Sequence, residues 1–325
     1  MARVAIMTTG GTISMIQDQT RGGAVPMLGA QQLLNSLPPE IAEVEVFEHC
    51  KLPSAQFTVD DLWAIRNRVV ETLSRSDVAG IVVTQGTDVL EEAAYLLDVT
   101  VGSEKPVVAT GGMRTGSQVG WEGGANLLAS VRVAASPHTR GLGTLVVLND
   151  EVHAARYVTK THTQSLDTFK SLGWGPVGRL DGDKLLIAMR LERYLIPCRA
   201  LEPNVSLIKL AVGMDDGFLR YALSQKVPGI VLEVMGGGRV PPWWMATIRQ
   251  AVAAGMAVVV TSRCPSGRIY DGYGFEGAYR DLAATGVLFA GDLNGPKARI
   301  HLMAALDASR RLAVPVSHFF ERRLR

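Results

Sequence analysis

The sequence predicts an α/β protein of two domains, each with a largely parallel β-sheet covered by helices. Short apolar runs alternate along the chain with longer segments whose apolar residues recur every three or four positions. Because parallel strands require long crossover connections, this alternation is typical of a parallel sheet. A segment with arginines and prolines interrupts it once, at residues 191–204, and separates an expected larger domain, 1–190, from a smaller one, 205–325.

The first part of the chain has the clearer pattern. Residues 4–7 read Val-Ala-Ile-Met, which predicts a buried strand, and Leu62, Ile65, Val69 and Leu73 have the spacing of one helix face. We predict strands at 4–7, 81–83, 107–110 and 145–148, and helices at 60–73, 88–97 and 125–135. Each predicted helix therefore connects two predicted strands.

The alternation resumes after the interruption. Pro197 and Pro203 fit neither a strand ladder nor a helix interior, so we interpret residues 191–204 as a linker. A final helix is expected to begin at Pro296, where the missing N–H costs nothing. We predict strands at 205–210, 230–234 and 257–261, and helices at 218–225 and 243–254.

The composition is that of an ordinary globular protein. The chain has 325 residues, of which 47% are hydrophobic and 20% charged, and its net charge is +2. So weak a charge gives no argument for a nucleic-acid or membrane partner, and we expect neither. Cys50, Cys198 and Cys264 are odd in number and far apart, which fits no disulfide framework or zinc motif. Because the sequence shows no secretory signal and no apolar span of bilayer length, we expect a cytoplasmic protein.

Two glycine-containing segments follow predicted strands and offer threonine hydroxyls. Residues 8–13 read Thr-Thr-Gly-Gly-Thr-Ile, and residues 84–88 read Thr-Gln-Gly-Thr-Asp. Ligands of open α/β sheets bind beyond the carboxyl ends of the strands, so we expect Thr12, Thr87 and Gly112 to lie there. The N–H groups of the glycines have no side chain over them, which suits an oxyanion hole. The pattern indicates hydrolysis by a hydroxyl nucleophile.

A threonine hydroxyl needs a neighbouring base or a lowered pKa to act as a nucleophile. Residues 158–161 read Val-Thr-Lys-Thr, and Lys160 supplies such a base if it is desolvated close to Thr87. Asp88 could fix this lysine or hold the amino group of a substrate. These residue types together suit general base chemistry on an acyl group.

Each of these residues also has a structural alternative. Thr12 could end a strand and cap the turn that follows. Asp88 and Glu91 have the spacing of a helix N-cap and its capping-box partner. Lys160, taken alone, would be an ordinary surface lysine. The local sequence leaves both interpretations of each residue open.

Other kinds of site fit the sequence less well. The glycine segments lack the G-x-G-x-x-G and Walker lysine patterns, and no serine lies in a G-x-S-x-G elbow. The six histidines are scattered, and none has the spacing of a metal-ligand pair. The sequence therefore contains no recognisable nucleotide or metal motif.

Taken together, the segments resemble the bacterial-type L-asparaginase/glutaminase family. The first family signature, T-G-G-T-I, matches residues 9–13, and the second, H-G-T-D-T, matches residues 85–89. The V-T-K-T segment of the family matches residues 158–161. Further matches are Gly-Met-Arg at 112–114, Gly-Gly-Ala-Asn-Leu at 123–127 and Pro-Lys-Ala-Arg at 296–299. The matches agree in order and spacing from residue 4 to about residue 310.

The resemblance implies a larger N-terminal flavodoxin-like domain, a smaller C-terminal α/β domain, and hydrolysis of a small-molecule amide without metal or organic cofactor. Thr12 is then the nucleophile. Thr87, Asp88 and Lys160 form a second catalytic cluster, in which Asp88 also binds the α-amino group of the substrate. The expected substrate-binding residues are Gly11, Ala55, Gln56, Gly86 and Gly112. Family members usually form tetramers of tight dimers, so we expect a homo-oligomer, either a dimer or a tetramer.

The chain departs from the family pattern around the expected ligand. Residues 14–37 contain no tyrosine, although family enzymes commonly keep one there that bonds the nucleophile. Tyr270 or Tyr273 could replace it. Ala55 stands where many relatives have a serine that binds the α-carboxylate, and Ser54 lies one residue before it.

Two further departures and one loop bear on the substrate. Gln85 and Val89 replace the histidine and the second threonine of the second signature, and residues 21–24 have the glycine-rich composition of a mobile lid. Two alternatives to hydrolysis of L-asparagine therefore stay open. One is the same machinery acting on another small amide, a lactam or a D-amino-acid derivative. The other is a non-catalytic ligand-binding protein on the same scaffold.

Overall fold

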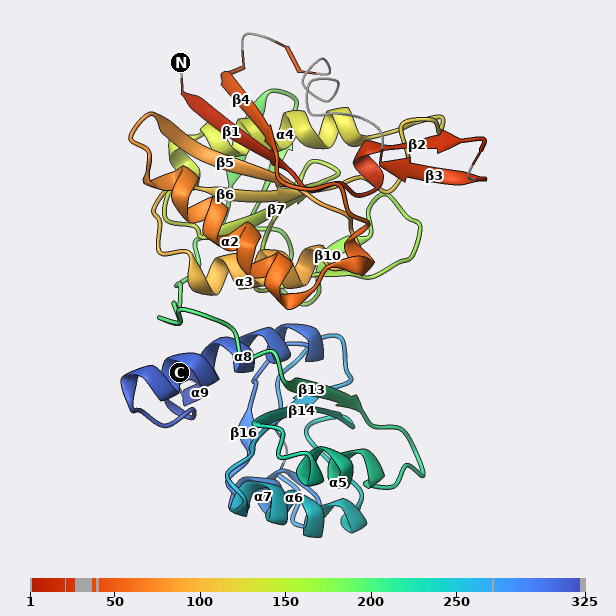
Figure 1. Ribbon diagram of the computed structural model, residues 1–325, viewed down its shortest axis with the longest axis vertical. Coiled ribbons are helices and arrows are strands. Elements are labelled where there is room, and N and C mark those ends of the chain that lie inside the picture. The colour runs from red at the N-terminus through yellow and green to blue at the C-terminus, as the bar shows by residue number, and fades with distance from the viewer. Residues whose placement is uncertain (1, 21, 27–36, 39–40, 271, 322–325) are drawn as a thin grey trace. The chain divides into compact units, whose positions relative to one another are not determined.

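The computed structural model describes residues 2–20, 22–26, 37–38, 41–270 and 272–321. The chain divides into two compact units, Met1–Leu195 and Ile196–Arg325 (Figure 1). Residues 188–204 form neither helix nor strand. Each unit has its own sheet and its own hydrophobic core.

The first unit is built on an eight-stranded sheet with the order β12-β11-β8-β7-β6-β5-β1-β4. The parallel strands are β1 (Arg3–Thr8), β4 (Glu43–Glu48), β5 (Val78–Thr84), β6 (Val107–Thr110) and β7 (Thr144–Leu148). The strands β8 (Glu151–Ala154), β11 (Gly178–Asp181) and β12 (Lys184–Ile187) extend the sheet in antiparallel fashion. The sheet is therefore parallel on one side of β7 and antiparallel on the other.

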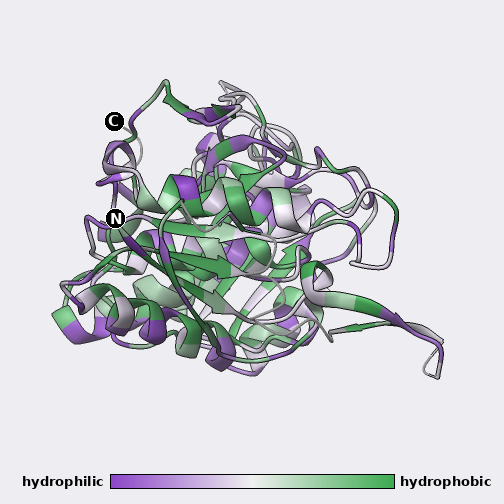
Figure 2. Ribbon diagram, turned by 90° about the horizontal axis from the view of Figure 1, so that it is seen from above, coloured by the Kyte–Doolittle hydropathy of each residue, from purple (hydrophilic) through white to green (hydrophobic). Residues whose placement is uncertain are grey.

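Alternate residues of β1 face two different hydrophobic layers. Val4 and Ile6 belong to the core that contains the apolar side of α4 (Gly123–Ala135). Ala5 and Met7 belong to the core on the opposite face, with residues of α2 (Val59–Ser74) and of α3 (Leu90–Thr100). Because both faces are covered, the central strands read as continuous apolar runs, which Figure 2 shows as hydrophobic strands between the helices.

The predicted strands and helices of the first unit are confirmed, with one helix start corrected. The predicted strands lie within β1, β5, β6 and β7, and the predicted helices coincide with α2, α3 and α4 apart from the start of α3. The alternative interpretation of Asp88 as a helix N-cap is wrong, because α3 begins at Leu90 and its N-cap is Val89, which makes no side-chain cap bond. The carboxylate of Asp88 instead forms an ion pair with Lys160.

Two small antiparallel sheets lie outside the eight-stranded sheet. One pairs β2 (Met15–Asp18) with β3 (Gly23–Pro26), and the other pairs β9 (Val158–Lys160) with β10 (Phe169–Ser171). The expected lid, residues 21–24, falls on this first hairpin: Gly23 and Ala24 are in β3, and Arg21 lies outside the described residues. The short 3-10 helices are η1 (Thr12–Ser14), η2 (Ser54–Gln56) and η3 (Pro137–Thr139).

The second unit has a four-stranded parallel sheet with the order β13-β14-β15-β16. Its strands are β13 (Val205–Lys209), β14 (Gly229–Val234), β15 (Ala257–Ser262) and β16 (Leu288–Phe289). Its helices are α5 (Gly217–Ser224), α6 (Met245–Ala253), α7 (Tyr279–Ala284), α8 (Gly295–Leu312) and α9 (His318–Glu321), with η4 (Pro242–Trp244) preceding α6. The predicted elements of this part are confirmed, except that Trp243 and Trp244 lie in η4 rather than in the α-helix.

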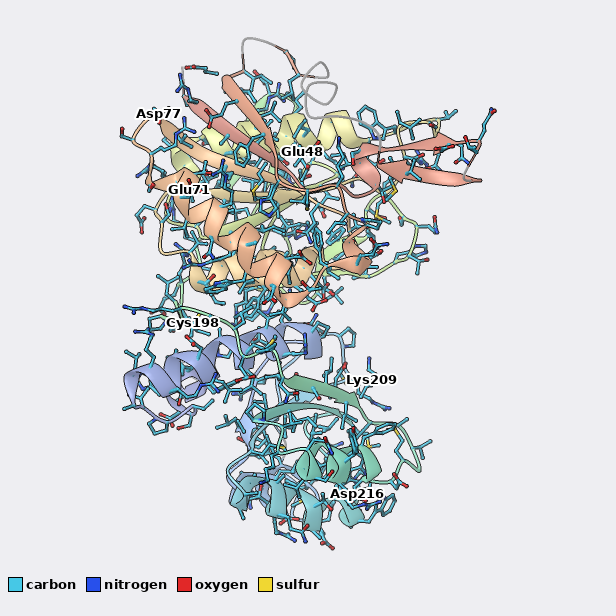
Figure 3. All side chains as sticks on the ribbon, viewed as in Figure 1. Glu48, Glu71, Asp77, Cys198, Lys209 and Asp216 are labelled. Carbon is cyan, nitrogen blue, oxygen red and sulfur yellow. The ribbon has the colours of Figure 1, made fainter. Side chains whose placement is uncertain are left out.

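Local polar contacts fix the ends of these helices. Asp216, labelled in Figure 3, precedes α5, and its carboxylate accepts hydrogen bonds from Arg220 and from Thr247 of α6. The side chain of Asn294 caps α8 by accepting from the N–H of Lys297 at 3.1 Å. The helix begins at Gly295, one residue before the predicted start at Pro296, and Pro296 lies in its first turn. No helix in the described ranges is long and apolar enough to cross a bilayer.

Candidate active site

The structure places Lys160 between Thr87 and Asp88. Its Nζ donates hydrogen bonds to Thr87 Oγ1 at 2.9 Å and to Asp88 Oδ1 at 2.8 Å. Thr87 is 5% exposed, the side chain of Lys160 is 19% exposed, and that of Asp88 is 64% exposed. The alternative of an ordinary surface lysine is therefore wrong, because this ammonium group is largely enclosed. The three side chains form one polar cluster that opens toward solvent on its carboxylate side.

The loop that follows β1 lies directly against the loop that follows β5. A Cβ on Gly11 would lie 2.2 Å from the backbone N of Gly86, and the φ of Gly11 is +84°. Only glycine allows this approach. The loops are also joined at Thr9, whose N–H and hydroxyl both donate to the carbonyl of Thr84, at 3.1 and 2.9 Å. The segments that carry Thr12 and Thr87 therefore meet at the carboxyl ends of β1 and β5.

Thr12 is the first residue of η1 and is partly buried. It neither ends β1, which stops at Thr8, nor caps the turn, because the N-cap is Gly11 and no side-chain cap bond is present. Within the described part of the chain, the hydroxyl of Thr12 makes no hydrogen bond, including to Thr87 or Lys160. The structural alternative for Thr12 is therefore wrong, and its hydroxyl is available for another partner.

The turn after β6 completes the junction of strand ends. A Cβ on Gly111 would lie 3.1 Å from Thr87 Cγ2, and a Cβ on Gly112 would lie 3.2 Å from Ile13 Cα. Asn126 of α4 holds this turn, since its Nδ2 donates to the carbonyl of Gly111 at 3.0 Å. Gly112 therefore borders the loops that carry Thr12 and Thr87.

Ser54 is a neighbour of the cluster that the sequence did not assign to it. It is 4% exposed, and its Oγ accepts a hydrogen bond from the N–H of Asp88 at 3.3 Å. A Cβ on Gly86 would lie 2.5 Å from Ser54 Oγ, so the serine packs on the loop that carries Thr87. Ala55 and Gln56, which the resemblance implied, are exposed in η2. The signal in the sequence was the position of Ser54 next to Ala55.

Glu91 is a second such neighbour. It is 8% exposed, and its Oε2 accepts a hydrogen bond from the backbone N–H of Lys160 at 2.8 Å. A pocket of about 390 Å³ opens beside it and is lined by Asp88, Glu91, Thr159, Lys160, Thr161, His162 and Thr163. Two carboxylates, one ammonium group and three threonines therefore line the same pocket, which suits a small zwitterionic or strongly polar ligand.

Two backbone N–H groups orient the imidazole of His162. Its Nδ1 accepts hydrogen bonds from the N–H groups of Gln164 and Ser165, both at 3.0 Å. Among the residues that the structure covers, no group of three His, Cys, Asp or Glu side chains could hold a metal ion.

Tyr270 and Tyr273, the suggested replacements for a missing loop tyrosine, lie in the second unit. Both are exposed, and their rings contact Tyr279 at 5.9 Å and Phe275 at 5.7 Å between centroids, respectively. These two contacts are made within the second unit, whereas Thr12 belongs to the first. A part for either tyrosine in activating Thr12 therefore stays a prediction.

The sheet order, the glycine-lined strand ends and the Thr–Lys–Asp cluster define a class of two-domain α/β proteins with a polar site beyond the parallel strands. Comparison with known families agrees with this architecture. The family model "Asparaginase, N-terminal" matches residues 3–193, and "Glutaminase/Asparaginase C-terminal domain" matches residues 204–314. The chain belongs to the asparaginase family.

Curated relatives cover most of the chain. A protein named L-asparaginase from Bacillus licheniformis is 36% identical over 307 residues, which cover 94% of this chain and 95% of that protein. "Probable L-asparaginase periplasmic" from Haemophilus influenzae is 30% identical, and the match covers 99% of this chain and 93% of that protein. "Glutaminase-asparaginase" from Pseudomonas fluorescens biotype A is 30% identical, and the match covers 94% of this chain and 86% of that protein.

Proposed function

We propose that this protein is an amidohydrolase that converts L-asparagine and water to L-aspartate and ammonia. The observation that carries the proposal is the position of Lys160 Nζ, within hydrogen-bond distance of both Thr87 Oγ1 and Asp88 Oδ1. This cluster lies in a chain of the asparaginase family, and the relative from Bacillus licheniformis is named for the same activity.

In the proposed reaction, Thr12 Oγ1 attacks the side-chain amide carbon of the substrate. The new C–O bond gives a tetrahedral intermediate, the C–N bond then breaks, and ammonia leaves with the proton of the threonine hydroxyl. Water attacks the resulting ester, which releases the carboxylic acid and restores the hydroxyl. Thr12 is supported as nucleophile because its loop lies directly against the loop that carries Thr87, and its hydroxyl is not engaged by any other described residue.

The remaining residues have supporting roles in this proposal. Lys160 and Thr87, whose polar atoms are in direct contact with each other, move protons between the nucleophile, the leaving group and water. Asp88 binds the α-amino group of the substrate with its exposed carboxylate oxygens. The N–H groups of Gly11 and Gly86 bond to no other described residue, so they are free to stabilise an oxyanion. The substrate-binding set is completed by Gly112, Ala55 and Gln56. The carbonyl of Gly112 accepts a hydrogen bond from the amide nitrogen of the substrate.

The test is ammonia release from a panel of L-asparagine, L-glutamine, D-asparagine and a small lactam. Discrimination among them is read in kcat/KM. We expect the highest value for L-asparagine, and no detectable turnover by a Thr12→Ala variant. A higher kcat/KM for another amide would overturn the substrate while keeping the reaction class. A thermal shift with L-aspartate but no turnover of any amide would indicate a binding protein and overturn the enzymatic proposal.

Assembly and location belong to the same proposal. We expect a homo-oligomer, a dimer or a tetramer of tight dimers, as the family resemblance implies, and light scattering on the purified protein tests it.

We expect a cytoplasmic location, which the three free cysteines, Cys50, Cys198 and Cys264, support because reducing compartments keep thiols free. Cell fractionation decides this, since the relative from Haemophilus influenzae is named as periplasmic.

A further inference from the structure

Lys160 is carried by a very short strand. β9 has three residues and pairs with β10 in a two-stranded sheet, separate from the eight-stranded sheet that positions Thr87 and Asp88. A sheet of two short strands is marginally stable by itself. Contacts outside the strand pair must therefore fix the distance between Lys160 and Thr87.

Hydrophobic packing provides the first of these contacts. Val158 of β9 and Phe169 of β10 are buried in a cluster with Leu90 and Ala94 of α3. This packing holds the strand pair against the helix that starts two residues after Asp88. Apolar contacts are non-directional, however, and they do not fix the position of a backbone group along the strand.

Glu91 provides a directional contact at Lys160 itself. It lies on the first turn of α3 beside Leu90, and its Oε2 accepts the backbone N–H of Lys160 at 2.8 Å. We propose that Glu91 is a positioning residue, whose carboxylate fixes the Lys160 backbone so that Nζ reaches Thr87 Oγ1. The expected effect on kcat rests on the function proposed above. The expected effect on the distance between Lys160 Nζ and Thr87 Oγ1 does not.

The physical chemistry favours a large effect from this single bond. The acceptor oxygen of Glu91 lies 2.8 Å from the N of Lys160, and Glu91 is nearly buried, so little water competes for this bond. Removing the carboxylate leaves the N–H of Lys160 without that acceptor, on a short strand whose other contact with α3 is apolar packing. A displacement of about 1 Å at a catalytic group lowers rates about 100-fold. The helix thus couples the loop of Thr87 and Asp88 to the strand of Lys160.

The experiment compares four variants with the wild type. Glu91→Ala removes the acceptor, and Glu91→Asp retracts it by one methylene. Glu91→Gln keeps an acceptor oxygen at the same reach without the charge. Glu92→Gln is the matched control, because Glu92 is also in the first turn of α3 but is not the acceptor for Lys160. All variants are checked for folding by circular dichroism and thermal unfolding before kinetics.

We expect Glu91→Ala and Glu91→Asp to lower kcat for L-asparagine at least 10-fold with KM changed less than about threefold, as for misplacement of a catalytic group. Glu91→Gln and Glu92→Gln should stay within about threefold of the wild-type kcat. Wild-type kcat in folded Glu91→Asp overturns the proposal, as does a Glu91→Gln variant as impaired as Glu91→Asp. Glu91→Asp keeps the test decisive if Glu91→Ala fails to fold.

A crystal structure of Glu91→Asp separates this inference from the proposed function. We expect the distance between Lys160 Nζ and Thr87 Oγ1 to lengthen from 2.9 Å to beyond hydrogen-bond range. An unchanged distance overturns the positioning role even if the enzyme is active. A wild type inactive toward every amide, combined with a lengthened distance in the variant, overturns the proposed function and supports the positioning role.

Discussion

Lys160 Nζ donates to Thr87 Oγ1 at 2.9 Å across a separation of 73 residues in the chain. Two independent pieces of backbone meet at this bond. Thr87 is placed by the carboxyl end of β5, and Lys160 by the short strand β9. Because the ammonium group also contacts Asp88 at 2.8 Å, a change at Lys160 removes the centre of the cluster rather than one of its edges.

Replacement of Lys160 by methionine should abolish most activity while leaving the fold intact. Methionine keeps the length of the side chain but removes the proton-transfer group, which contributes about 10²- to 10⁴-fold to a rate. The stability cost should stay within about 1 kcal/mol, because the pair with the largely exposed Asp88 is screened by solvent. Ammonia release and urea denaturation measure the two effects.

Lys184→Met is the matched control for this substitution. Lys184 is an exposed residue at the start of β12, and the same change there should leave kcat unaltered. Activity in Lys160→Met equal to that of Lys184→Met would contradict the assigned role.

Gly11→Ala tests the close approach of the two loops. The backbone of Gly11, with φ +84° and ψ 175°, lies in a region that essentially only glycine adopts, at a cost of about 1–3 kcal/mol for other residues. The new Cβ would also lie 2.2 Å from the backbone N of Gly86, which cannot move without displacing Thr87. We expect a loss of more than about 3 kcal/mol in unfolding free energy, together with loss of activity.

Gly255→Ala is the control for a positive φ without a clash. Gly255 has the same φ of +84°, but nothing lies within 4 Å of its ideal Cβ. This variant should lose only about 1 kcal/mol and keep full activity. Equal destabilisation of the two variants in guanidinium titrations would show that the contact between the loops contributes nothing.

Much of the fold could be predicted from the sequence because the central strands are buried on both faces. The continuous apolar run of β1 and the helical spacing of α2 both report burial directly. The strands β2, β3, β9 and β10 could not be predicted in the same way, since three or four residues of mixed polarity give no clear period.

The candidate site could be predicted only where the residue types themselves indicate chemistry. The glycine-flanked hydroxyls and the single lysine allow Thr87, Asp88 and Lys160 to be assigned to one site. The local pattern also fits a helix cap at Asp88. Ser54 and Glu91 could not be assigned in this way, because each acts through a hydrogen bond to the backbone of a distant residue. Such a bond depends on tertiary contacts, so the only local signal was the position of Ser54 next to Ala55.

Ser54→Ala should impair both the site and the fold. Ser54 Oγ accepts the N–H of Asp88 at 3.3 Å, and loss of a buried acceptor costs about 1–3 kcal/mol. We expect kcat/KM to fall about 10-fold, because the Asp88 carboxylate loses its fixed position. Ser224→Ala removes an exposed serine whose Oγ donates to Tyr221 at 2.7 Å, and it should change neither quantity. A wild-type kcat/KM in folded Ser54→Ala would show that Ser54 does not position Asp88.

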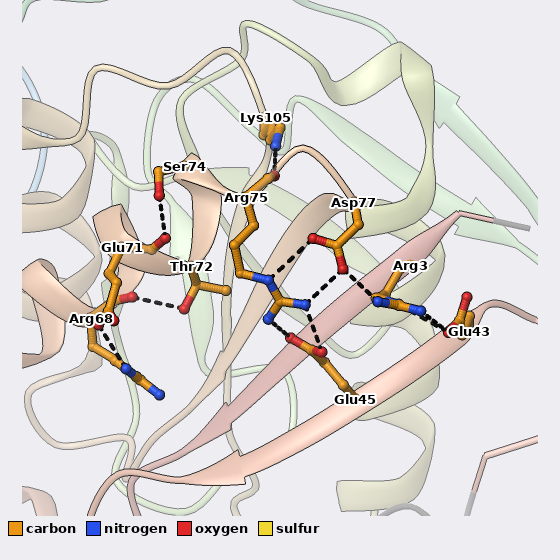
Figure 4. A network of polar contacts seen from close by, with 10 residues as sticks. All are labelled: Arg3, Glu43, Glu45, Arg68, Glu71, Thr72, Ser74, Arg75, Asp77 and Lys105. Atoms are coloured by element: carbon orange, nitrogen blue, oxygen red, sulfur yellow. Dashed lines mark hydrogen bonds and ion pairs between the residues drawn. The ribbon is translucent and has the colours of Figure 1, made fainter.

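Asp77→Asn tests a charge network at the edge of the parallel sheet (Figure 4). Asp77 accepts hydrogen bonds from Arg75 at 2.8 Å and from Arg3, and the bond from Arg75 is the main reason that its pKa is lowered to about 2. A carboxyl group with a lowered pKa stabilises the fold above its unfolded pKa, and this contribution is lost as the pH falls through the folded value.

The expected signature is a difference in Tm that depends on pH. Wild type should be more stable than Asp77→Asn at pH 7, and the gap should close as the pH falls from the ordinary value of 3.8 to about 2. The effect should be small and weaken with salt, because the network is exposed. Asp183→Asn, in the exposed turn between β11 and β12, is the control and should follow wild type at every pH. A gap between wild type and Asp77→Asn that stays constant down to pH 2 would mean that the ion pairs of Asp77 do not stabilise the fold.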